Sequence, residues 1–120
     1  MVKDKVYLPY GTHLIIDMSG CDAREIDDMD HLLNVMADAA KASGMHVIQV
    51  SSKKFEPVGV SVILLLEESH MSVHSYPKFG VAMFDIFTCG EKDALKAFSV
   101  IVNNVRHEYV ILNKMSRGVK

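Results

Sequence analysis

The strongest constraint on the fold is a series of β-rich segments that follow one another along the middle of the chain. They are either apolar or alternate polar with apolar residues, and they lie at 45–51, 58–66, 70–75 and 80–88. Two similar segments lie at 10–18 and 108–113. Their short lengths and their content of β-branched and aromatic residues favour strands over helices. The sequence therefore predicts six strands, four of them consecutive.

Two other segments have the periodicity of amphipathic helices. In the first, Asp22 is a suitable N-cap, and Gly44 stands where a C-cap glycine is expected. Between them, apolar residues recur at steps of three and four and so share one helix face: Ile26, Met29, Leu33, Met36 and Ala40. The second helix follows the turn at Cys89-Gly90 and carries a similar apolar face: Ala94, Phe98, Ile101, Val102 and Val105.

The predicted order is strand, helix, four strands, helix, strand. Two helices cannot cover both faces of a six-stranded sheet. We therefore expect an α+β protein, a two-layer α/β sandwich with a mostly antiparallel sheet and both helices on one face. The other sheet face then needs a partner, which favours a dimer.

The composition is that of an ordinary globular protein. The 120 residues suffice for a single domain with its own core, and no linker divides them. The hydrophobic fraction is 49%, the charged fraction 23% and the net charge −2, so we expect no nucleic-acid-binding surface.

Membrane insertion and export are not expected either. The longest apolar run, Val58–Leu66, is far shorter than the roughly 20 residues of a membrane-spanning helix. No apolar segment follows Met1–Lys5, so we expect no signal peptide. Cys21 and Cys89 form neither a disulfide framework nor a metal-ligand pattern. We therefore expect a cytoplasmic protein without a metal.

Chemically useful side chains concentrate between residues 61 and 89, among strongly apolar strands. They are Ser61, Glu67, Glu68, Ser69, His70, Ser72, His74, Asp85 and Cys89. Each has an ordinary explanation when taken alone. Residues 67–70 can form a solvated hairpin turn, Ser61 can bond to backbone, and Cys89 can be a small buried hydrophobic residue. A strand histidine such as His74 is more often simply hydrogen-bonded than catalytic.

Taken together, these residues form a much more specific pattern. Glu68-Ser69-His70, then His74, then Phe87-Thr88-Cys89-Gly90 resembles the prokaryotic S-adenosylmethionine decarboxylase proenzyme family. The similarity covers about residues 10–105. Further matches lie upstream, at Gly11, His13, Cys21, Asp22, Phe55, Pro57, Gly59, Val60 and Ser61.

The resemblance implies that the chain cuts itself between Glu68 and Ser69. A β chain of residues 1–68 and an α chain of residues 69–120 would result, with Ser69 converted to a pyruvoyl group. The Ser69 hydroxyl would attack the Glu68 carbonyl, which requires a strained backbone and a stabilised oxyanion. By the same resemblance His74 is the processing base and Ser61 assists it. We expect a strand-to-strand turn flanked by this pair to supply donors and a base.

The resemblance also implies the reaction. The pyruvoyl group would form a Schiff base with the substrate amine and accept the electrons released with CO2. Cys89 would then protonate the substrate carbon. The family's product, decarboxylated S-adenosylmethionine, serves spermidine and other polyamine synthesis. Phe55 matches an aromatic residue that stacks on adenine, although core packing is an equally good interpretation of Phe55.

One position departs from the family pattern. Lys78 replaces a glutamate that holds the ribose hydroxyls, and lysine cannot accept hydrogen bonds. Ornithine or arginine is therefore an alternative substrate, with Asp17 able to hold either a sulfonium or a distal amine. A non-catalytic, unprocessed regulatory relative is a further alternative. It is disfavoured because Ser61, Ser69, His74 and Cys89 are all present.

Overall fold

The computed structural model describes residues 7–120 and contains one six-stranded sheet. The prediction that no signal peptide lies at Met1–Lys5 falls outside the described residues. The strands are β1 Tyr10–Ser19, β2 Val47–Lys54, β3 Val60–Leu66, β4 Ser69–Tyr76, β5 Val81–Cys89 and β6 Tyr109–Gly118. Their spatial order is β2-β3-β4-β5-β1-β6, and every neighbouring pair is antiparallel. The four predicted consecutive strands are therefore confirmed, with β2 to β5 lying side by side.

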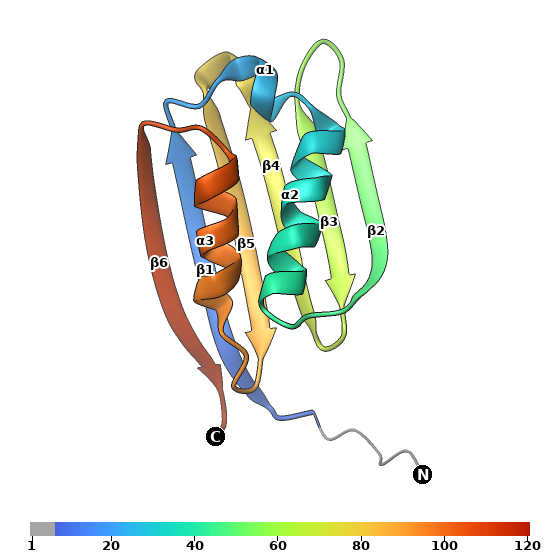
Figure 1. The fold of residues 1–120 in the computed structure, drawn as a ribbon, viewed down its shortest axis with the longest axis vertical. Coiled ribbons are helices and arrows are strands. Elements are labelled where there is room, and N and C mark those ends of the chain that lie inside the picture. The colour runs from blue at the N-terminus through green and yellow to red at the C-terminus, as the bar shows by residue number, and fades with distance from the viewer. Residues whose placement is uncertain (1–6) are drawn as a thin grey trace.

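The helices cover one face of this sheet, which confirms the predicted two-layer sandwich (Figure 1). They are α1 Ala23–Ile26, α2 Met29–Ala42 and α3 Ala94–Asn104, and a 3₁₀ turn, η1, spans Pro77–Phe79. In Figure 1, α2 lies over β3 and β4, and α3 lies over β5 and β1. Among residues 7–120 no helix has the length and apolar character needed to cross a membrane.

Strict alternation along the strands creates the core beneath the helices. On β3 the even-numbered residues from Val60 to Leu66 are buried, and on β4 the odd-numbered residues from Ser69 to Ser75 are buried. The opposite parity faces away from the helices. The largest fully buried side chains are Leu14, Ile16, Met18, Ile26, Leu32, Met36, Leu64, Leu66, Met71, Phe84, Ile86 and Ile101.

The first helical segment is split in two, whereas the sequence predicted one helix. Asp22 is the N-cap as expected, because its carboxylate accepts hydrogen bonds from the amides of Arg24 and Glu25. The helix stops after Ile26, and Asp28 caps a second helix by accepting from the His31 amide at 3.0 Å. Asp27, the C-cap of α1, and Asp28, the N-cap of α2, therefore separate the two helices. Gly44, with φ of +72°, follows the end of α2 as predicted.

Two strands extend beyond their predicted ends. β2 continues to Lys54, three residues beyond the predicted end at Ser51. β6 runs to Gly118 and pairs with β1 along that strand's whole length, from Tyr10↔Gly118 to Ser19↔Tyr109. Both are edge strands, where charged residues are common because one side faces solvent. Because the ends of both strands are polar, the sequence predicted strands that were too short.

The sheet face opposite the helices has no cover within residues 7–120, and it is not a polar surface. Large exposed apolar side chains lie on it from three different strands: Ile63, Leu65, Met83, Ile111 and Met115. We refer to it as the open face. Histidines and carboxylates lie among these apolar groups: His13, Asp17, His70, His74 and Asp85.

Candidate active site

The tight turn between β3 and β4 is strained at one residue. Leu66 pairs with Ser69, so only Glu67 and Glu68 connect the two strands. Glu68 has φ of +48°, and it is the one non-glycine residue with positive φ among residues 7–120. A side chain in this left-handed region costs on the order of 1 kcal/mol, and such residues are concentrated at functional sites. The strained residue directly precedes Ser69.

Ser69 is held against the end of β5. Only 4% of its surface is exposed, and its Oγ accepts a hydrogen bond from the Cys89 amide at 3.1 Å. The Cys89 thiol in turn donates to the Leu8 carbonyl oxygen at 2.9 Å. The structure therefore brings together Ser69 and Cys89, two of the predicted site residues that are 20 positions apart in the sequence.

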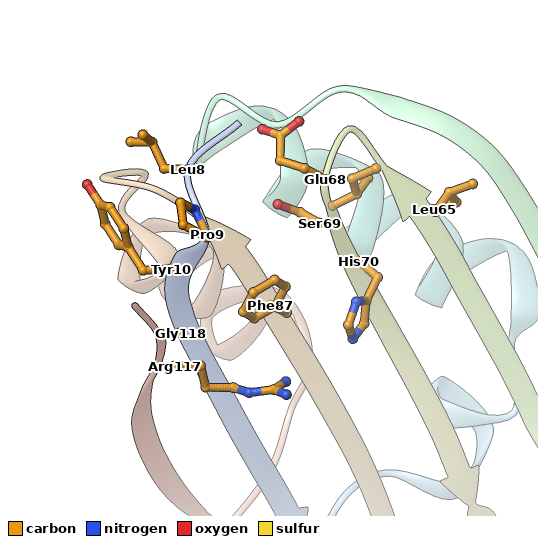
Figure 2. Close-up of a pocket in the computed structure, with 11 residues that line it drawn as sticks. Leu8, Pro9, Tyr10, Leu65, Glu68, Ser69, His70, Phe87, Arg117 and Gly118 are labelled. Atoms are coloured by element: carbon orange, nitrogen blue, oxygen red, sulfur yellow. The ribbon is translucent and has the colours of Figure 1, made fainter. Parts of the chain in front are cut away.

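A pocket of about 520 Å³ opens beside Ser69 (Figure 2). It is lined by Leu8, Pro9, Tyr10, Leu65, Leu66, Glu68, Ser69, His70, Phe87, Arg117 and Gly118. Figure 2 shows Glu68 and Ser69 at the hairpin turn, with His70, Phe87 and Arg117 further down the sheet. Its volume falls in the range of small-molecule sites, and its mixture of apolar walls and few polar groups is typical of them.

A cluster of rings and charges extends from this pocket across the open face. The His13 Nε2 lies 3.0 Å from the Asp85 Oδ1, and the His13 and His70 ring centroids are 6.3 Å apart. Both rings contact Phe87, and the Arg117 guanidinium lies 5.4 Å from the centre of the Phe87 ring. Burial and then the neighbouring His13 lower the pKa of His70 below its ordinary value of 6.5.

Lys92 forms an ion pair with the residue that precedes Ser69. Its Nζ lies 3.2 Å from the Glu68 Oε1, and both side chains are mostly buried. The other carboxylate oxygen, Oε2, is buried and has no hydrogen-bond partner among residues 7–120. Lys92 was not singled out from the sequence. It lies in the connection between β5 and α3, and only the register of three strands brings it to the hairpin.

Ser61 and His74 contact each other but not Ser69. They are directly opposed on β3 and β4, and the Ser61 Oγ lies 2.7 Å from the His74 Nδ1. His74 is five residues beyond Ser69 on the same strand, which corresponds to about 17 Å at the usual strand rise. The expectation that this pair flanks the Ser69 turn is therefore wrong for one chain. In an antiparallel hairpin, directly opposed residues lie at the same distance from the turn. Ser61 is therefore as far from the Ser69 turn as His74 is.

The remaining predicted residues lie at the His74 end of the sheet. Asp17 pairs in register with Met83, which also pairs with His74, so the three belong to one row across the open face. Lys78 lies in η1 and lines a second, smaller pocket of about 200 Å³ with Tyr76 and Phe79. Neither residue lines the Ser69 pocket.

Phe55 lies in the connection between β2 and β3, and 44% of its surface is exposed. The core-packing interpretation of Phe55 is therefore wrong. Its backbone is held in place because its amide donates to the Gly59 carbonyl oxygen at 2.8 Å. Within residues 7–120, no group of three or more His, Cys, Asp or Glu side chains is arranged to hold a metal ion.

The lowered pKa of His70 gives a pH prediction. Because the unfolded chain binds this proton more tightly than the folded protein, stability should fall as the pH drops from about 6.5 toward the lowered pKa. An NMR titration should place the His70 midpoint below 6.5, and His13→Gln should move it upward. A midpoint at or above 6.5 would contradict the lowering of the His70 pKa by partial burial and by His13.

With this geometry in place, comparison with known proteins identifies the family. The chain matches the family model described as S-adenosylmethionine decarboxylase over residues 12–118. It is 40% identical over 114 residues to the S-adenosylmethionine decarboxylase proenzyme 2 of Bacillus cereus, covering 94% of this chain and 93% of that protein. The corresponding proenzyme of Pyrococcus abyssi is 38% identical over 111 residues, covering 92% and 80%. The crystal structure of the adenosylmethionine decarboxylase from Aquifex aeolicus superposes with a TM-score of 0.86 at 27% identity, covering 94% of each chain. The protein therefore belongs to the S-adenosylmethionine decarboxylase family.

Proposed function

We propose that this protein is a self-processing, pyruvoyl-dependent decarboxylase that acts on S-adenosylmethionine in the cytoplasm and so supplies polyamine synthesis. The observation that carries the proposal is the position of Ser69. It follows a strained residue, it is buried, its hydroxyl accepts from the Cys89 amide, and it lines a pocket of substrate size. A hairpin turn with no chemical role needs none of these features.

Self-cleavage would begin at this turn. The Ser69 Oγ attacks the Glu68 carbonyl carbon, the peptide C–N bond breaks, and an ester joins the two residues. A base then removes the Ser69 α-proton, the Cβ–Oγ bond breaks, and the Glu68 carboxylate leaves. Water converts the remaining dehydroalanine to pyruvoyl with loss of ammonia. The positive φ of Glu68 supports this route, because breaking the peptide bond releases the strain.

The residues around Ser69 suit the group that it would form. Once present, the pyruvoyl group supplies an electron sink for decarboxylation, as pyridoxal phosphate does in other enzymes. Two contacts support Cys89 as the proton donor: its amide donates a hydrogen bond to the Ser69 hydroxyl, and its thiol donates one to the Leu8 carbonyl oxygen. Leu8, Leu65 and Phe87 give the pocket beside Ser69 apolar walls.

The separation of Ser69 from His74 supports a homodimer. If His74 is the processing base and Ser61 orients it, the pair must come from elsewhere, because in one chain it is about 17 Å away. A two-fold axis through the middle of the open face would lay the His74 end of one sheet over the Ser69 end of the other. The same contact would bury the exposed apolar groups of that face, such as Ile63 and Met83.

S-adenosylmethionine is preferred as the substrate because relatives that this chain matches over most of their length are named S-adenosylmethionine decarboxylase proenzymes. The dimer would also bring Phe55, Asp17 and Lys78 from the partner toward the pocket, where an aromatic ring suits adenine and a carboxylate suits a cation. Lys78 cannot accept ribose hydroxyls, so this contact must come from another group. Ornithine and arginine remain the comparison substrates in the test.

The first prediction is self-cleavage coupled to decarboxylation. Mass spectrometry should find one fragment ending at Glu68 and another beginning with pyruvoyl at position 69. Ser69→Ala should stay intact, because it lacks the attacking oxygen. The processed protein should release CO2 from S-adenosylmethionine faster than from ornithine or arginine. An intact wild-type chain, or a clear preference for either amino acid, would refute the corresponding part of the proposal.

Substitution of Cys89 should lower substrate turnover without preventing self-cleavage. Cys89→Ala should still produce both fragments, but turnover should fall by at least about 100-fold through loss of a general acid. Protonation at the wrong carbon should also convert residue 69 to alanine, which N-terminal sequencing detects because a pyruvoyl end is blocked. Wild-type turnover without appearance of alanine would show that Cys89 is not the donor.

Processing in trans tests the dimer. His74→Ala alone should remain uncut, and so should Ser69→Ala. When the two variants are co-expressed with different tags, a mixed dimer contains one intact site, made of Ser69 from the first variant and His74 from the second. At equal expression about half of the His74→Ala chains should then be cleaved. If co-expression yields no fragments, the two residues act within one chain or His74 is not the base.

A further inference from the structure

The ion pair between Glu68 and Lys92 lies beside the bond that self-cleavage would break. The Lys92 Nζ is 3.2 Å from the Glu68 Oε1, and side-chain exposures are 32% and 18%. The Glu68 Oε2 is buried without a hydrogen-bond partner among residues 7–120. A buried carboxylate with an unsatisfied oxygen is costly, and it persists in native structures mainly where it has a role. Lys92 is the cation that offsets this charge.

The proposed chemistry makes this charge a particular problem. In the elimination step the Ser69 Cβ–Oγ bond breaks, and its electrons remain on the Glu68 main-chain carboxylate. A second negative charge therefore develops on a residue whose side chain is already negative. The two carboxylates of one residue lie within a few ångströms of each other, where like charges repel strongly outside bulk water. A cation held at Glu68 lowers the energy of this transition state.

We propose that Lys92 is a positioning residue for self-processing, which neutralises the Glu68 side chain so that the Glu68 main-chain carboxylate can leave. This role rests on the proposed function. Lys92 contacts the Glu68 side chain rather than the reacting atoms, and it holds this side chain over the strained turn. The role concerns the elimination step, because the preceding conversion of amide to ester creates no lasting negative charge on Glu68.

The test compares cleavage rates of freshly translated chains on denaturing gels. Lys92→Met should slow fragment formation by about tenfold or more, since a fixed charge near a developing charge contributes on that scale. Lys92→Arg should cleave close to the wild-type rate, because it keeps the charge. Lys96→Met is the matched control on the neighbouring exposed surface of α3 and should cleave like the wild type. Circular dichroism checks that each variant is folded.

Two further measurements distinguish this role from a general loss of structure. The double variant Lys92→Met/Glu68→Gln should cleave faster than Lys92→Met, because it removes the charge that Lys92 offsets. Uncut Lys92→Met should also contain the ester. Hydroxylamine should therefore split it into a fragment ending at Glu68 and a fragment that begins with an ordinary serine.

The outcomes separate the two proposals. If the wild type is cut and Lys92→Met is cut equally fast, the role of Lys92 is refuted and the proposed function stands. A slow Lys92→Met that resists hydroxylamine, or that the second substitution does not speed up, also refutes the charge-offsetting role. If the wild type itself remains intact under all conditions, the proposed function fails and the role of Lys92 fails with it.

Discussion

The register of the antiparallel strands β3, β4 and β5 is the constraint on which the rest of this site depends. The tight turn fixes Leu66 opposite Ser69, and every other pairing follows from it, including Ser61 opposite His74. The pairing of β4 with β5 then carries Cys89 to the Ser69 hydroxyl. A slip of one residue would turn all these side chains to the other face, and the buried alternation of β3 and β4 opposes such a slip.

The two faces of the sheet have different roles: one stabilises the fold, and the other carries most of the reactive side chains. The residues under α2 and α3 are almost all apolar and fully buried, so they stabilise the fold; Ser69, at the start of β4, is the one predicted catalytic residue that shares their parity. The open face carries His13, His70, His74 and Asp85 among exposed apolar side chains, and Ser69 lies at its edge. An apolar surface that also holds polar reactive groups suits burial against a second copy better than contact with water.

The sequence predicted the architecture well because strand alternation, the Asp22 cap and the glycine after α2 are local signals. It predicted one helix where there are two, because Asp27 ends the first and the adjacent Asp28 begins the second. It also identified Ser69 and Cys89, which the structure brings into contact. The position of His74 far from Ser69 could not be predicted in the same way, because nearness in sequence is not nearness along an extended strand. Lys92 could not be found at all from the sequence, because its contact with Glu68 depends on the register between β4 and β5.

Strain and charge therefore concentrate at one residue, Glu68, and they act on cleavage in opposite directions. Glycine or asparagine would fit the positive φ of this turn better, and a neutral side chain would avoid the unsatisfied Oε2. Cleavage after Glu68 frees its backbone from the turn, so the strained conformation is needed only until the chain is cut. A residue that destabilises the intact chain more than its products favours processing in the forward direction. On this argument, the strain at Glu68 is part of the mechanism, whereas the charge of its side chain opposes the elimination step and is offset by Lys92.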